Sequence, residues 1–204
     1  EIIKELAENE GYSFIEIIPN FKEELDSKKI NVNIEINEGT RVYVNSININ
    51  GNTRTVDKVI RRELGLSEGD AYNKFSVNYS RDSIRALNFF SSVEVNDIKS
   101  NFPDKVDLVI DVEEKNTGEA SVGAGYSSST SGSITFGLRE NNFLGKGQKV
   151  NFASSFAKTR STYDISIVQP YFNNKDLSLS LDLYSSFTDP TSVNYETEDL
   201  GFGI

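Results

Sequence analysis

The chain has 204 residues, a net charge of −10, and no cysteine, histidine, tryptophan or methionine. Without cysteine and histidine it forms no disulfide and no thiolate nucleophile, and it lacks the commonest general base and the commonest zinc ligand. The acidic balance argues against nucleic acid as a partner, because that affinity comes from clustered lysine and arginine.

Two regions of different composition follow one another along the chain. Charged residues are frequent up to Lys115, and beyond it serine, glycine, phenylalanine and tyrosine become more common. No apolar run approaches the ~20 residues that a membrane-spanning helix needs, so any crossing of a membrane would use strands. The chain has no methionine, opens inside a predicted helix and stops inside an alternating pattern, which predicts that it is a piece of a longer protein.

The first region repeats itself at an offset of 76 positions. At this offset Ile30–Ile36 lies over Val106–Val112, and both stretches alternate apolar and polar residues as half-buried strands do. Such a repeat predicts tandem copies of one small domain. Residues 1–39 would be the C-terminal part of one copy, and residues 40–115 a complete second copy.

The complete copy predicts the element order β-α-α-β-β. A strand over 42–49 ends in a turn at 50–52, and a helix should run from an N-cap at Thr55 to a stop at Gly65. A second helix is predicted over 75–87, followed by strands over about 92–98 and 106–112. Only a three-stranded sheet with both helices on one face buries these short apolar stripes, with Tyr79, Phe89 and Phe90 in the core.

The second region alternates in short segments, each with the length of a tilted transmembrane strand. Aromatic residues gather toward the segment ends, as in an interfacial girdle. A soluble antiparallel sandwich alternates in the same way, so the pattern alone leaves both architectures open. The alternating segments are 134–139, 150–156, 163–167 and 177–184, and the terminal aromatics are Tyr126, Phe143, Tyr171, Phe172 and Phe187.

An ordered set of motifs resembles the BamA outer-membrane assembly family at its junction between the last POTRA domain and the barrel. The motifs lie at residues 51–55, 61–63, 89–93, 112–118, 123–128, 142–147 and 169–172, in the order in which the family carries them. The resemblance implies α+β POTRA modules followed by an antiparallel transmembrane β-barrel. Residues 116–204 would be the first five or six of its 16 strands.

The resemblance also implies what the whole protein does and where. Family members fold and insert β-barrel proteins into the bacterial outer membrane, with the POTRA region in the periplasm. Their partners are BamD-like lipoproteins, unfolded β-barrel clients and outer-membrane lipid. The resemblance implies no enzymatic activity, no catalytic residue, no metal and no cofactor.

Three sets of residues are expected to have roles in the whole protein, two of them carried over from the family and the third taken from the alternation of residues 177–184. The positions matching Arg61 and Glu68 lie where the lipoprotein docks, although a charge cluster on a helix is also typical of a solvated face. The stretch 119–127 would be the first barrel strand, whose small residues favour either a weak lateral seam or tight curvature. The seam residues are Val122, Gly123, Ala124, Gly125 and Tyr126, and the expected lipid-facing residues are Leu177, Leu179, Leu181 and Leu183.

Three other functions compete with assembly. A two-partner secretion transporter also joins POTRA domains to a 16-stranded barrel but exports one protein. An outer-membrane enzyme would need a nucleophile with a base or a metal site, and no such constellation is visible in the sequence. A soluble periplasmic adaptor would require residues 116–204 to be soluble without detergent.

Overall fold

The computed structural model describes residues 3, 6–7, 15–24, 29–37, 39, 41–128, 131–189 and 196–204. The helix expected at the start of the chain falls mostly outside these residues. The chain divides into two compact units, which are described separately. The first comprises residues 1–52 and 60–114, and the second comprises residues 53–59 and 115–204.

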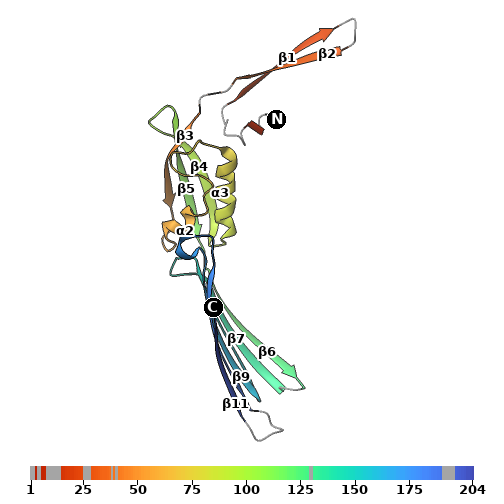
Figure 1. The fold of residues 1–204 in the computed structure, drawn as a ribbon, viewed down its shortest axis with the longest axis vertical. Coiled ribbons are helices and arrows are strands. Elements are labelled where there is room, and N and C mark those ends of the chain that lie inside the picture. The colour runs from red at the N-terminus through yellow and green to blue at the C-terminus, as the bar shows by residue number, and fades with distance from the viewer. Residues whose placement is uncertain are drawn as a thin grey trace. The chain divides into compact units, whose positions relative to one another are not determined.

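The first unit contains an antiparallel hairpin and a three-stranded sheet with helices (Figure 1). The hairpin pairs β1 (Glu16–Glu24) with β2 (Lys29–Asn37). The sheet has the order β3-β5-β4, with β3 (Tyr43–Asn50) parallel to β5 (Lys105–Glu114) and β4 (Phe90–Lys99) antiparallel to it. The predicted order β-α-α-β-β is confirmed.

The core of this unit lies on one face of the sheet. Along β5 the side chains at 106, 108, 110 and 112 are buried, whereas those between them are less covered. Ile60 and Ile84 come from the two helices and are fully buried. Because only one face of the central strand is buried, both helices cover that face, as predicted.

The second helix, α3 (Lys74–Ala86), matches its prediction closely. Asn73 caps it, with its side-chain oxygen accepting a hydrogen bond from the N–H of Phe75 at 2.8 Å. Val77, Ser80 and Ile84 are its buried residues, and Phe89 and Phe90 are also buried. The prediction that Tyr79 is a core residue is wrong. Tyr79 is 55% exposed because the buried face of α3 is formed by Val77, Ser80 and Ile84, and Tyr79 lies outside that face.

The first helix is shorter than predicted. Helix α2 covers Asp57–Arg61 and begins two residues after Thr55. The N–H groups of Glu63 and Leu64 donate to the carbonyls of Ile60 and Arg61, three residues back. The chain thus tightens into a turn directly after Arg61, and Leu64 and Gly65 lie beyond the helix.

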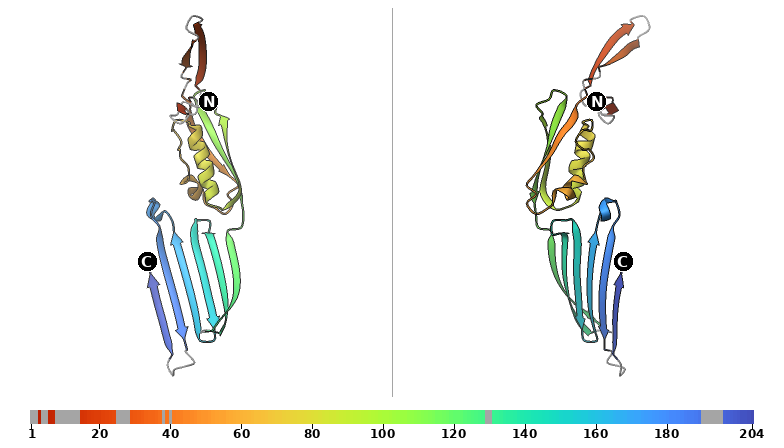
Figure 2. Two further views of the ribbon diagram at one scale, coloured as in Figure 1. Left: turned by 90° about the vertical axis from the view of Figure 1, so that its right-hand side faces the viewer. Right: turned by 60° about the vertical axis from the view of Figure 1, so that its left-hand side comes forward.

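The second unit contains one antiparallel sheet with the strand order β11-β10-β9-β8-β7-β6 (Figure 2). Each strand pairs with its neighbour in sequence, and β6 and β11 lie at the two edges. All predicted strands of the second region are present. The strands are β6 (Gly118–Ser127), β7 (Ser131–Phe143), β8 (Gln148–Ala157), β9 (Arg160–Gln169), β10 (Leu179–Thr188) and β11 (Thr197–Gly203), with a short 3-10 turn at Phe172–Asn174.

Candidate functional site

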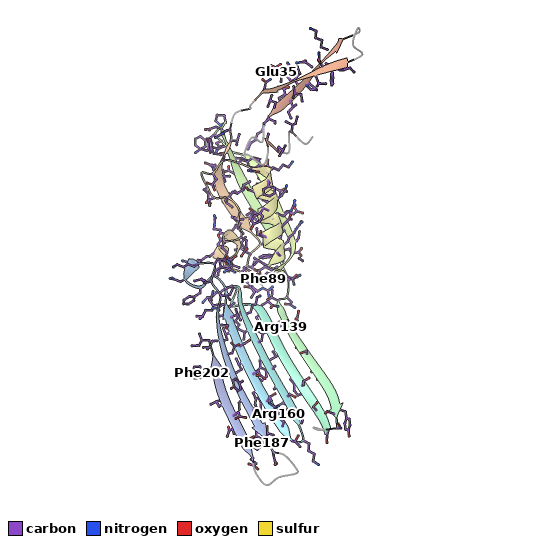
Figure 3. All side chains as sticks on the ribbon, turned by 45° about the vertical axis from the view of Figure 1, so that its right-hand side comes forward. Glu35, Phe89, Arg139, Arg160, Phe187 and Phe202 are labelled. Atoms are coloured by element: carbon purple, nitrogen blue, oxygen red, sulfur yellow. The ribbon has the colours of Figure 1, made fainter. Side chains whose placement is uncertain are left out.

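The register of the six strands sorts their side chains onto two different faces. Residues directly opposite one another in an antiparallel ladder point to the same face. One row crosses all six strands and is entirely apolar: Ala120, Leu138, Phe152, Ile165, Leu183 and Phe202. The row one residue away is mostly polar: Glu119, Arg139, Asn151, Ser166, Asp182 and Gly203. Figure 3 labels Arg139 of the polar row and Phe202 of the apolar row.

The apolar face is open. Leu138 is 57% exposed and Phe202 is 76% exposed, and no described element of the second unit packs over them. Aromatic side chains cluster on this face, with the Phe156 ring edge-to-face against Phe136 at 6.2 Å and against Tyr163 at 5.5 Å. A contiguous exposed apolar surface of this kind marks contact with a partner or a membrane.

The predicted leucine stripe lies on this apolar face, with one difference at its start. Leu179, Leu181 and Leu183 pair with Gln169, Ile167 and Ile165 of β9. Leu177 precedes β10, so the strand begins two residues later than its alternation predicts. The carbonyl of Leu177 accepts the N–H of Phe172 at 2.7 Å, which closes the connection from β9 and delays the start of the strand.

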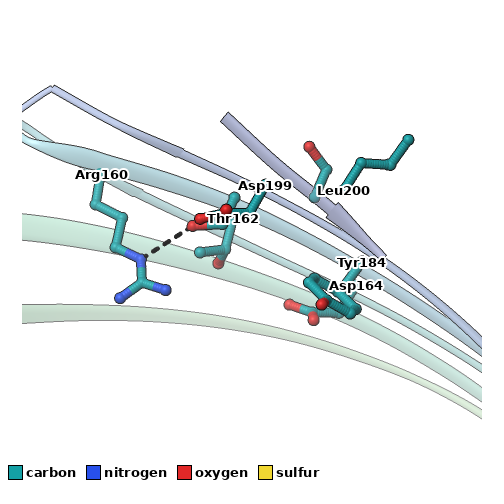
Figure 4. A pocket seen from close by; sticks show the side chains of 8 residues that line it. Arg160, Thr162, Asp164, Tyr184, Asp199 and Leu200 are labelled. Atoms are coloured by element: carbon teal, nitrogen blue, oxygen red, sulfur yellow. Dashed lines mark hydrogen bonds between the residues drawn. The ribbon is translucent and has the colours of Figure 1, made fainter. Parts of the chain in front are cut away.

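The polar face carries side-chain hydrogen bonds that run across the strands. Arg139 Nε donates to Asn151 Oδ1 at 3.0 Å, and Asn151 Nδ2 donates to Ser166 Oγ at 3.1 Å. Farther along, Arg160 Nε donates to Ser186 Oγ at 3.3 Å (Figure 4). This face therefore satisfies its polar groups partly within the sheet and suits a water-filled space.

A tyrosine fits over a glycine on the polar face, which the sequence reading missed. Tyr184 pairs with Gly201, and a Cβ added to Gly201 would lie 2.2 Å from two atoms of the Tyr184 ring. Beside this pair is a hollow of about 430 Å³ whose lining includes Arg160, Asp164 and Asp199 (Figure 4). A glycine inside an alternating strand often marks a close approach by another group, so Gly201 was a visible signal in the sequence. The residue opposite it can be identified only once the register of β10 with β11 is known.

Strand β6 has a ladder partner on only one side among the described residues. It pairs with β7 along its whole length, and Val122 and Tyr126 are 75% and 85% exposed. A Cβ on Gly123 would lie 2.6 Å from Thr135 Oγ1, so this glycine makes room for the hydroxyl opposite it. Gly125 faces Ser133 in a similar but less crowded way.

Arg61 and Glu68, the two residues expected at the lipoprotein contact, lie together. Arg61 Nη1 and Glu68 Oε1 are 2.9 Å apart, and Arg61 Nη2 donates to the carbonyl of Ile47 at 2.7 Å. The backbone N–H of Glu68 and then the Arg61 guanidinium lower the pKa of the Glu68 carboxyl below its ordinary value. The pair is therefore charged at neutral pH, and it is lost only as the pH falls through that lowered pKa.

The part of the chain that the structure describes contains neither a metal-binding cluster nor a membrane-spanning helix. No three histidine, cysteine, aspartate or glutamate side chains there form a group able to hold a metal ion. None of the helices there is long and apolar enough to span a membrane.

Comparison with known proteins assigns both units. The sequence model described as "POTRA: Surface antigen variable number repeat" matches residues 42–115, and the Omp85 superfamily domain matches residues 142–204. The outer membrane protein assembly factor BamA of Neisseria meningitidis is 32% identical over 200 residues, which cover 95% of this chain and 25% of that protein. The chain belongs to the BamA family. It spans about a quarter of the length of this curated relative.

Solved structures agree with this family membership. BamA from Haemophilus ducreyi lacking POTRA domains 1–3 superposes with a TM-score of 0.84 at 26% identity, covering 98% of this chain and 39% of that one. CdiB from Escherichia coli gives a TM-score of 0.57 at 11% identity, covering 98% of this chain and 37% of that one. The CdiB likeness shows that the fold is shared, and the BamA-family assignment rests on the closer matches.

Proposed function

We propose that the protein containing this chain folds β-barrel proteins and inserts them into the bacterial outer membrane. The observation that supports this is a six-stranded antiparallel sheet with one apolar face, one polar face and a first strand that, within the described part of the chain, has a partner on only one edge. In hydrocarbon every backbone N–H and C=O needs a partner, so such a sheet is stable only as part of a closed barrel. Residues 116–204 are then the first strands of a transmembrane β-barrel, and further strands of the whole protein close it.

The domain boundaries and the compartments follow from the same proposal. Residues 1–39 are the C-terminal part of one POTRA domain, residues 40–115 are the last POTRA domain, and both lie in the periplasm. Leu179, Leu181 and Leu183 contact outer-membrane lipid, in keeping with their place on the apolar face. We extend the same role to Leu177, which precedes the strand. The protein acts without a cofactor.

The edge strand is the proposed working surface of the barrel. Val122, Gly123, Ala124, Gly125 and Tyr126 form the lateral seam, where the barrel opens and an unfolded client strand pairs with β6. Pairing of an extended segment to an exposed sheet edge uses main-chain hydrogen bonds and needs no ATP.

The Arg61–Glu68 pair is the proposed contact for a BamD-like lipoprotein. Both side chains are partly exposed, at 39% and 46%, so a partner can reach them. Arg61 is fixed by Glu68 and by the Ile47 carbonyl, which holds the guanidinium in one place before docking.

Reconstitution of the full-length protein tests the proposed function. Liposomes with the protein and its lipoprotein partners receive an unfolded β-barrel client, and insertion is followed by protease protection and by heat-dependent gel mobility. We expect several unrelated clients to insert faster than into liposomes without the protein. Equal rates with and without it would refute the assembly function.

Two-partner secretion is the second candidate, because the CdiB fold is shared. A transporter of this class would move one cognate substrate across the same liposomes and leave unrelated barrel clients uninserted. The 26% identity and TM-score of 0.84 to a BamA structure favour assembly.

A further inference from the structure

The short segment 53–59 packs within the second unit, against the turn that joins β7 to β8. The N–H of Val56 donates to the carbonyl of Gly145 at 3.0 Å, and Asn142 Nδ2 donates to Thr55 Oγ1 at 2.9 Å. Thr55 is only 2% exposed. The segment thus meets the turn through both a main-chain and a side-chain hydrogen bond.

Gly145 makes this approach possible. Its φ is +71°, in the left-handed region that favours glycine. A Cβ at this position would lie 1.9 Å from the carbonyl oxygen of Arg54. No other residue fits here without moving the segment away from the turn.

The last residues of β7, directly before this turn, also hold the residues that lead into β6. Glu140 Oε1 accepts hydrogen bonds from the Thr117 hydroxyl and, at 2.7 Å, from the N–H of Asn142. The backbone and side-chain amides of Asn141 both donate to the carbonyl of Thr117 at 3.2 Å. Thr117 directly precedes Gly118, the first residue of β6 and the ladder partner of Glu140.

Segment 53–59 is tied to the same lead-in. Arg54 Nη2 donates to the carbonyl of Lys115 at 2.9 Å. The β7–β8 turn itself is closed by local bonds, from the N–H groups of Gly145 and Lys146 to the carbonyls three residues back and from the Gly147 N–H to Asn142 Oδ1 at 2.8 Å. The additional bonds all involve residues 115–117: Glu140 accepts from the Thr117 hydroxyl, Asn141 donates to the Thr117 carbonyl, and Arg54 donates to the Lys115 carbonyl.

We propose that Glu140, Asn142 and Thr55 are positioning residues that anchor the start of β6. The strand pairs with β7 from Gly118 to Ser127, but among the described residues no strand pairs with its other edge, and its small side chains give little packing. The bonds to residues 115–117 therefore add to this one ladder in fixing where β6 begins. An anchored start sets the register that β6 offers to an incoming strand, because a slip of one residue would exchange its two faces. This role rests on the proposed assembly function, whereas the anchoring itself can be measured without it.

Hydrogen–deuterium exchange of the full-length protein in lipid nanodiscs tests the anchoring. Glu140→Ala removes the acceptor, whereas Glu140→Gln keeps an oxygen in the same place. Amides at 118–121 should exchange on the order of tenfold faster in Glu140→Ala, with β8 and β9 unchanged, because one hydrogen-bonded partner is lost locally. Glu140→Gln should stay close to the unaltered protein.

Thr55→Val tests the second half of the network with a side chain of the same shape. It should also speed exchange at 118–121, and Thr162→Val, the same change on the polar face of β9, should leave those amides unaffected. Unchanged exchange in Glu140→Ala, equal effects of Gln and Ala at position 140, or a rise spread over all six strands would each overturn the anchoring.

Client insertion separates the anchor from the assembly function. We expect insertion to slow in Glu140→Ala and to recover in Glu140→Gln. Faster exchange at 118–121 with a normal insertion rate would overturn the positioning role. Failure of the unaltered protein to insert clients would instead refute the assembly function, while the exchange data would still decide the anchoring.

Discussion

Replacing Ile165 by arginine should destabilise the folded sheet in lipid by about 2–4 kcal/mol. Ile165 is the sixth of the ten residues of β9, so it lies ~17 Å along the strand at about 3.3 Å per residue. With a strand tilt of about 40°, this places it ~13 Å deep in an apolar band of about 25 Å. The guanidinium would therefore sit near the midplane, where burial of a charge costs most.

The neighbouring residue provides a control at nearly the same depth. Ser166 lies on the polar face, opposite Asn151 and Asp182, so an arginine there would meet water and a carboxylate. Equilibrium unfolding of the full-length protein in lipid vesicles, by guanidinium titration, measures both variants. The expected cost for Ile165→Arg is roughly a 30- to 700-fold change in the unfolding equilibrium, with much less for Ser166→Arg. Equal costs for the two variants would refute the assignment of the apolar face to lipid.

Three further predictions address other parts of the chain. Glu68→Lys should reduce lipoprotein recovery in a pull-down at a stability cost of about 1 kcal/mol, because it breaks only an exposed ion pair with Arg61, and undiminished recovery would contradict the docking role. Gly201→Ala should cost on the order of 1 kcal/mol in the same unfolding assay, because it displaces the half-exposed Tyr184 ring. The matched Gly203→Ala variant meets its nearest atom at an ordinary 3.7 Å, so equal costs would contradict the tyrosine–glycine fit. A disulfide between a cysteine at Val122 and one on the last strand of the full barrel should stop client insertion, and normal insertion by the locked protein would exclude an opening seam.

Local pattern was enough to predict most elements, because period and turn chemistry act over a few residues. The alternation in β8 and β10 and the apolar spacing in α3 placed these elements within a few residues of their bounds. Tyr79 was misassigned because aromatic character does not tell which side of a helix faces the sheet.

Contacts between residues far apart in the chain could not be predicted from the sequence. The Tyr184–Gly201 pair depends on the register of β10 with β11, and the contact between Thr55 and Asn142 joins residues 87 positions apart. Neither residue of the second pair differs in type from an ordinary turn residue. Such contacts are set by the folded backbone, and no local period encodes them.

The glycines of β6 take on a different meaning once the register is known. At position 123 the Thr135 hydroxyl occupies the space that a Cβ would fill, so packing alone explains why a glycine is present there. The seam role proposed for β6 does not depend on Gly123, because β6 is held to β7 by ladder pairing from Gly118 to Ser127 with few large side chains on its polar face. Main-chain pairing depends little on the sequence of the partner strand. An edge of this kind can accept strands of many different clients, which a machine for general assembly needs and a transporter for one substrate does not.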